Sequence, residues 1–121
     1  MSNIDLTQLI TAEARAAQAA TARSGAIKAA CRALILGAVG ETAQANIAQA
    51  GVIYAAMRAD GVSADAARAQ AGFVEGDLET AAAWKAWVAA MQGECRRAID
   101  AGDDPAWPAL PVGVATLAAR F

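Results

Sequence analysis

Residues 78–99 read LETAAAWKAWVAAMQGECRRAI, and this stretch decides the fold. Its apolar side chains recur at intervals of three and four residues, the spacing that places them on one face of an α-helix. The members of this stripe are Trp84, Trp87, Val88, Met91, Cys95, Ala98 and Ile99. The pattern predicts an amphipathic helix from Leu78 to about Asp100, with its tryptophans as anchors of a core.

Upstream of this stretch, breaker and capping residues divide the chain into three further helices. We expect these helices at about Asp5–Leu36, Glu41–Ala59 and Ala64–Ala71. Glycine ends a helix readily because it can adopt a left-handed backbone, and Ser or Asp can cap the helix that follows. The residues that mark the boundaries are Gly37, Gly40, Asp60, Gly61, Ser63, Gly72 and Asp77.

Downstream of the same stretch, Gly102 ends the helix and a proline-rich segment follows. Three prolines between residues 105 and 111 exclude a helix there, so this arm must be extended. We expect Trp107, Leu110 and Val112 to pin the arm to the helices, with a last short turn at residues 117–121.

Alanine dominates the composition, with 37 of 121 residues, whereas only 5% of the residues are aromatic. Alanine has the highest intrinsic helix propensity but buries little area, so the core depends on a few large side chains. Strand-forming residues nowhere alternate over a useful length. The predicted fold is all-α: a long N-terminal helix, a small helical bundle of about three further helices, and a Pro-rich extended C-terminal arm. We divide the chain into a protruding Ala-rich helical part at residues 1–24, the helical bundle at 25–102, and the Pro/Trp arm packed on the bundle at 103–121.

The first helix has a special character, because residues 12–23 offer nothing larger than threonine on an apolar face. Heptad-like steps align these small residues in rows, and such rows let another helix approach closely. At 1.5 Å per residue the helix would be roughly 48 Å long. We expect residues 1–24 to protrude as an assembly seam, the alternative being a chain that folds back at Ser24-Gly25. The predicted partner-facing residues are Leu6, Leu9, Ile10, Ala16, Ala17 and Ala20, together with Trp107 of the arm.

The sequence offers little for catalysis or for metal binding. It contains no histidine, the commonest general base and metal ligand. Cys31 and Cys95 are far apart along the chain and are expected to be buried free thiols. The acidic residues near the end of the fourth helix are expected to be solvated rather than to bind a cation. We therefore predict no enzyme activity, no cofactor and no metal site.

The charge balance and hydropathy argue against a nucleic acid or a membrane as partner. The net charge is −2 and the sequence pI is near 5.0, whereas nucleic-acid-binding domains are usually basic. The longest stretch without charged residues, Thr42 to Met57, is too short and too polar to span a bilayer. Residues 1–12 lack the pattern of a signal peptide, so we expect synthesis in the cytoplasm.

Several segments resemble a helical region found late in many tail-fibre and tail-associated proteins of bacteriophages and prophages. The opening DLTQLITAE at residues 5–13 is similar to the start of that region, and AACRA at residues 29–33 to a patch within its alanine helix. ETAQANI at 41–47 and AWKAWVAAM at 83–91 are similar to the helical hairpin that follows. Together the resemblance covers about half of the chain, and it implies no catalytic residues.

The resemblance implies a structural protein of the phage virion that is associated with the tail or tail fibre. Such a protein would act by helix-mediated self-assembly, as a homo-oligomer, or by docking to another phage tail protein. It would be located in the virion after synthesis in the host cytoplasm. Two alternatives stay open: a tail-assembly chaperone or adaptor, and a bacterial helical ligand-binding or regulatory domain with a pocket near Tyr54, Trp84 and Trp87.

Overall fold

The computed structural model describes the backbone of residues 3–121 and the side chains of residues 8, 9 and 11–121. Its five helices are α1 (Asn3–Ala38), α2 (Glu41–Ala59), α3 (Ala64–Ala71), α4 (Asp77–Ala101) and α5 (Val114–Arg120). No strand occurs among the described residues. The prediction of an all-α fold is therefore confirmed.

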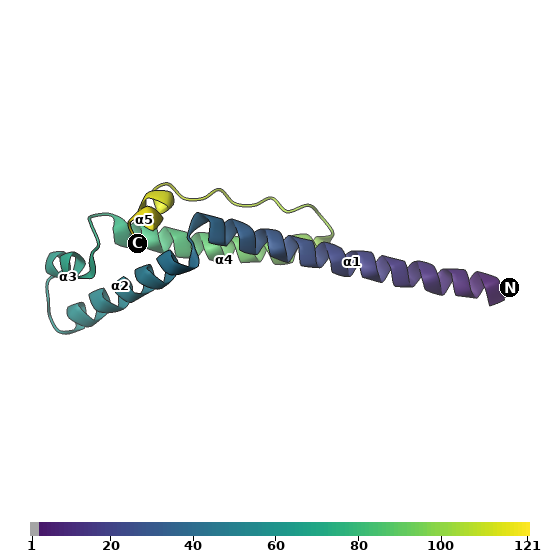
Figure 1. Cartoon of the computed structure of the whole chain (residues 1–121), viewed down its shortest axis with the longest axis horizontal. Helices are drawn as coiled ribbons and strands as arrows, with labels where there is room; N and C mark the ends of the chain where they lie inside the picture. Colours follow the sequence, from purple (N-terminus) through teal and green to yellow (C-terminus); the bar gives the residue numbers. More distant parts are fainter. Residues whose placement is uncertain (1–2) are drawn as a thin grey trace.

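The molecule is elongated because two long helices lie side by side and one of them extends past the other. α1 and α4 run antiparallel and pack against each other, and the first half of α1 continues beyond the end of α4 toward the N-terminus (Figure 1). α2 and α3 pack together at the opposite end of the molecule, and α5 lies beside the start of α4. α1 stays helical through Ser24 and Gly25, so the chain does not fold back at that point.

The ends of the middle helices are encoded locally. The predicted bounds of α2 and α3 are confirmed residue for residue. The Ser63 hydroxyl accepts a hydrogen bond from the Ala66 N–H at 3.2 Å, as expected of an N-cap. Gly72 follows α3 in the left-handed conformation, with φ of 86°, where a side chain would be strained.

The predicted cap of α4 is wrong. Gly76 occupies the N-cap position, and Asp77 is already the first residue of the helix. The buried Asp77 carboxylate reaches backward to accept a hydrogen bond from the Val74 N–H at 2.8 Å, and it pairs with Arg120 of α5. The Asp77 carboxylate therefore binds Arg120, which is distant along the chain, and does not cap α4 as the local sequence predicts.

The core consists of three adjoining clusters of buried side chains. The first joins α1 to α4 and contains Ile27, Cys31, Trp87, Met91, Cys95 and Ala98. The second contains Val39, Ile47, Val114 and Leu117, and it joins α5 to the α1–α2 connection. The third contains Ala50, Ala71 and Phe73, and it joins α2 to α3 and the loop beyond. The predicted stripe of α4 supplies four members of the first cluster, as its helical spacing requires.

The arm between α4 and α5 is held to α4 by side chains of that helix. Trp87 Nε1 donates a hydrogen bond to the Pro108 carbonyl at 3.0 Å, and the Glu94 carboxylate accepts one from the Ala106 N–H at 2.9 Å. Trp107 packs against the first cluster, as predicted. Val112 does not pin the arm, since 99% of its surface is exposed. The last helix begins earlier than the predicted turn, at Val114.

Candidate interaction surface

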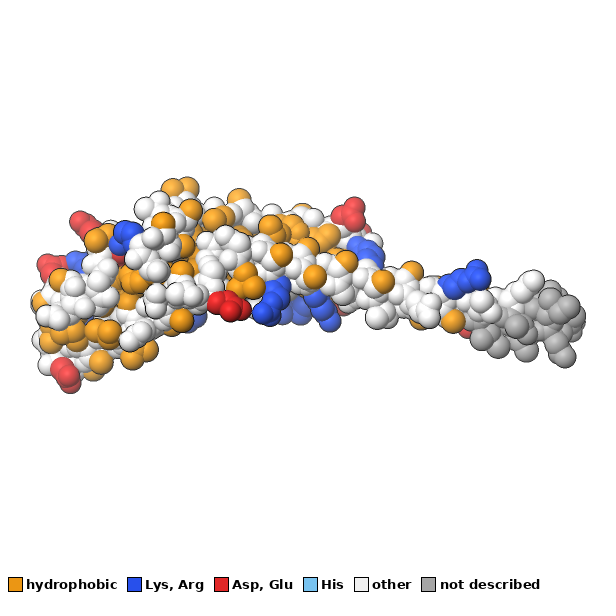
Figure 2. Space-filling model, viewed as in Figure 1, with side chains coloured by type: hydrophobic (Ala, Val, Ile, Leu, Met, Phe, Trp, Pro, Cys, Tyr) orange, Lys and Arg blue, Asp and Glu red, His pale blue; other side chains and the backbone are white. Residues whose placement is uncertain are grey.

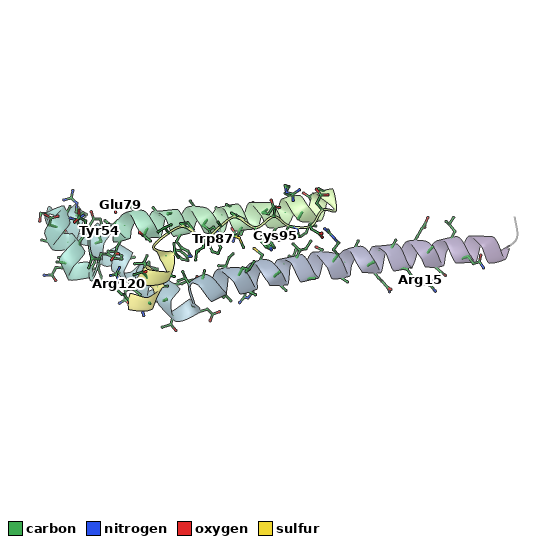
Figure 3. All side chains as sticks on the ribbon, turned by 90° about the horizontal axis from the view of Figure 1, so that it is seen from above. Arg15, Tyr54, Glu79, Trp87, Cys95 and Arg120 are labelled. Atoms are coloured by element: carbon green, nitrogen blue, oxygen red, sulfur yellow. The ribbon has the colours of Figure 1, made fainter. Side chains whose placement is uncertain are left out.

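The most exposed part of the fold is the N-terminal half of α1. We call residues 3–22 the α1 extension. Every side chain from residue 11 to residue 22 is exposed, and Leu9 keeps 51% of its surface accessible. The extension forms the slender end of the molecule in Figure 2, and Arg15 points away from all other elements in Figure 3.

One row of small residues on the extension continues the face of α1 that is buried against α4. Steps of three and four residues lead from Ala17 and Ala20 through the half-buried Ser24 to Ile27 and Cys31, both in the first core cluster. Residues at this spacing share one helix face. The side of α1 that α4 covers in one half of the helix is therefore presented to solvent in the other half.

Polar contacts fix the position at which α1 leaves α4. Arg23 Nη1 donates a hydrogen bond to the Ala98 carbonyl at 3.4 Å, and Nη2 donates to the Asp103 carbonyl. Both carbonyls lie at the C-terminal end of α4, one in its last turn and one in the residue after Gly102. Arg23 thus attaches α1 to the C-terminal end of α4.

The predicted interface residues are not all in comparable positions. Ala16, Ala17, Ala20 and Leu9 are exposed on the extension. The side chains of Leu6 and Ile10 lie outside the described residues. Trp107 is half-buried against the core of its own chain, more than 70 residues along the sequence from the extension. The structure therefore brings the four described α1 residues onto one projecting segment and leaves Trp107 on a separate surface.

Two grooves flank the α1–α4 pair. One, of about 770 Å³, lies on the basic side and is lined by Lys28, Cys31, Arg32, Ile35, Leu36, Glu41, Gln44, Val88, Gln92, Cys95 and Arg96. Arg32 and Glu41 form an exposed ion pair of 3.8 Å across its rim. The other groove, of about 370 Å³, is mostly apolar and is lined by Ala33, Leu34, Gly37, Ala38, Trp87, Met91, Trp107, Pro108 and Leu110. Sequence reasoning identified neither groove, because each is formed by segments that are distant along the chain.

Three aromatic residues were named for the alternative ligand pocket, Tyr54, Trp84 and Trp87, and they do not share one cluster of the core. Tyr54 packs against the third core cluster, Trp87 belongs to the first, and Trp84 packs between the first and the second. Of these three residues only Trp87 lines a groove, and it does so as the wall of the apolar one. The aromatic side chains are anchors of separate clusters, which is their usual role in a core with few large residues.

A small ion-pair network joins the end of α4 to the arm. Arg97 forms ion pairs with Glu94, at 2.6 Å, and with Asp103, at 3.1 Å. The hydrogen bonds from Arg97 and from the Ala106 N–H lower the pKa of Glu94 to about 2. The hydrogen bonds to Glu94 and Asp103 raise the pKa of Arg97 above its ordinary value. The network keeps Glu94 ionised and holds the arm close to the base of the α1 extension.

The described residues contain no group of three or more acidic, histidine or cysteine side chains that could hold a metal ion. Among them, no helix combines the length and the apolar character that crossing a bilayer requires. Comparison with protein-family models, with curated proteins and with solved structures gave no match to this chain.

Proposed function

We propose that this chain is a structural protein of a bacteriophage or prophage virion, associated with the tail, and that the α1 extension is its assembly seam. The extension would bind a helix of a second copy or of a larger tail protein. The observation that supports this proposal is the row of small residues that runs from the buried α1–α4 interface onto the exposed extension.

The physical reason for a partner is the weak stability of an isolated helix. Most of the stability of a protein helix comes from packing of one face against another element. The extension is rich in alanine, which has a high helix propensity. However, no side chain of residues 11–22 is buried against the rest of the chain. A helix that packed along Ala16, Ala17 and Ala20 could approach closely, because methyl side chains leave the backbones near each other. Repetition in a symmetric assembly would offset the small area that each contact buries.

The assignment to a phage tail rests on the resemblance of residues 5–13, 29–33, 41–47 and 83–91 to tail-associated proteins. The first of these segments lies in the α1 extension, and the last lies in the part of α4 that packs against α1. In this proposal the half of α1 that packs against α4 anchors the helix in the fold, and the α1 extension binds the partner. Partners would be copies of this chain or other tail proteins, and the protein would end in the virion.

The test compares single substitutions on opposite faces of the extension. Ala17→Glu and Ala20→Glu place a charge on the row that continues the buried face. Ala22→Glu adds the same charge on the other side of the helix, about 160° around the axis from Ala20. Glutamate is nearly as good a helix former as alanine, so all three variants should keep the helix. The readout is the mass of the full-length protein by light scattering, together with its helix content by circular dichroism.

If the row is the seam, the wild type is an oligomer, the two row variants are monomers, and the Ala22 variant stays oligomeric. Equal effects of all three substitutions would reject the seam. A monomeric wild type would instead favour docking to a different tail protein or a chaperone role. Mass spectrometry of purified virions then separates a structural component from an assembly factor, because only the former remains in the particle.

A further inference from the structure

The two cysteines of the chain, one on α1 and one on α4, meet in the core. Cys31 and Cys95 are both free and buried, with 6% and 8% of their surfaces exposed, and both belong to the first core cluster. Because they share one cluster, with Cys31 on α1 and Cys95 on α4, the two residues lie on the facing sides of these helices. Figure 3 shows Cys95 directed from α4 toward α1. The expectation of two buried free thiols is confirmed, but their pairing across two helices was not foreseen.

Both thiols also line the basic groove between the two helices. The groove is also lined by Lys28, Arg32 and Arg96, and by Glu41, which forms an ion pair with Arg32. A small anionic reagent bound in this groove would lie next to both cysteines without unfolding of the helix pair. The three cations favour the approach of an anionic reagent.

We propose that Cys31 and Cys95 are an oxidisable pair that forms a disulfide between α1 and α4 with a small anionic disulfide, such as oxidised glutathione, as the oxidant. One thiol loses its proton, its sulfur attacks the oxidant, and one glutathione thiolate leaves. The second protein thiolate then attacks the mixed disulfide and displaces the other glutathione. In total the protein loses two electrons and two protons, and the oxidant becomes two thiols.

The position of this pair gives the bond a structural consequence. Cys31 lies two helical turns after Arg23, the residue that marks the base of the α1 extension. A disulfide here would tie α1 to α4 covalently while leaving the extension itself unchanged. The inference concerns how the extension is held, and it stands whether the extension binds a copy of this chain or another protein.

The oxidation should be slow at neutral pH. Burial, together with the neighbouring thiol of Cys95, raises the pKa of Cys31. Since only the thiolate attacks, the rate should increase about tenfold per pH unit as long as the pH stays below that pKa.

The experiment uses the reduced, full-length protein at low concentration and without denaturant, treated with oxidised glutathione. The expected product is a monomeric chain that has lost the mass of two hydrogen atoms and carries no glutathione. Digestion should give one peptide pair joined through Cys31 and Cys95. Glutathione left on both cysteines, bonds only between chains, or two thiols that persist after treatment at raised pH would each overturn the proposal.

Two variants separate the pair from the reactivity of a single cysteine. Cys31→Ala and Cys95→Ala each keep one thiol in the same groove. Each should stop at a glutathione adduct, because no second thiol is present to resolve it. If either variant does not fold, the peptide map of the wild type still decides the proposal. A wild type that forms the bond only after addition of urea would also contradict it, since the proposed bond belongs to the folded helix pair.

Discussion

Arg120, in the last turn of α5, forms an ion pair with Asp77, the first residue of α4. The Asp77 side chain is 6% exposed and also accepts the hydrogen bond from Val74, whereas that of Arg120 is 36% exposed. The pair connects the last residue of α5 to the start of α4. It therefore secures α5, which supplies Val114 and Leu117 to the second core cluster.

The Asp77 pair predicts a stability that depends on pH in the acid range. Burial raises the pKa of Asp77, but the hydrogen bonds from Arg120 and Val74 and the charge of Arg120 outweigh it, so the pKa lies below the ordinary 3.8. The stabilisation is therefore fully present above pH 3.8 and is lost as the pH falls through the lower folded-state pKa. Urea unfolding at several pH values should show Asp77→Asn less stable than wild type by about 2 kcal/mol at pH 7.

That difference should shrink below pH 4, where the wild-type carboxyl also becomes neutral. Arg120→Met is the matched control for the pair, and it should cost more than Asp77→Asn at pH 7 because it leaves a buried carboxylate without its cation. A difference between wild type and Asp77→Asn that stays constant from pH 7 to pH 2 would show that the charge of Asp77 is not responsible.

Glu94 should titrate well below an ordinary glutamate. Its pKa of about 2, compared with an ordinary 4.5, is set first by the hydrogen bonds from Arg97 and then by the Ala106 N–H. We expect Arg97→Met to move the pKa of Glu94 upward toward 4.5, although Ala106 still donates. Carboxyl carbon shifts in an NMR titration would measure both values. An unchanged pKa of Glu94 in the variant would contradict the assigned cause.

Trp84 and Trp87 are a matched pair of indoles with different polar contacts. Trp87 Nε1 donates to the Pro108 carbonyl at 3.0 Å, whereas the buried Nε1 of Trp84 has no hydrogen-bond partner in the described part of the chain. Phenylalanine removes the same atoms at both positions, so the packing losses are of similar size. We expect Trp87→Phe to destabilise the protein by about 1 kcal/mol more than Trp84→Phe, because only Trp87 loses a satisfied hydrogen bond. Urea unfolding of both variants measures the difference, and the reverse order would refute it.

The proposed Cys31–Cys95 disulfide also has a thermodynamic consequence. It would close a loop of several tens of residues, for which the chain-entropy model gives about 4 kcal/mol of stabilisation as an upper value. The oxidised protein should therefore unfold at higher urea than the reduced protein. Adding dithiothreitol to the oxidised sample should restore the lower midpoint. The Cys95→Ala variant serves as control, since the same oxidation should leave its midpoint nearly unchanged.

Local signals predicted much of the secondary structure. The bounds of α2 and α3 could be predicted because the signals that end and cap these helices act within one or two turns. These signals are the helix end at Asp60-Gly61, the Ser63 cap and the left-handed Gly72. The errors concern contacts between distant segments. Local sequence predicts Asp77 as the N-cap of α4. It cannot reveal that the carboxylate binds Arg120, which lies 43 residues away in the chain. Local sequence predicts that Val112 packs on the helices, and nothing near it in the chain indicates that it faces solvent.

The amino-acid sequence by itself determined the class of the fold, the length of its helices and the apolar face of α4, because helix propensity, capping and residue spacing are local properties. Tertiary structure alone decided which faces meet. It brought Cys31 to Cys95, Arg23 to the end of α4, and Arg120 to Asp77. It also decided that α4 ends before it can cover the row through Ala17 and Ala20. The length of a helix relative to its neighbour depends on how the two are aligned in space, and no local pattern encodes that alignment.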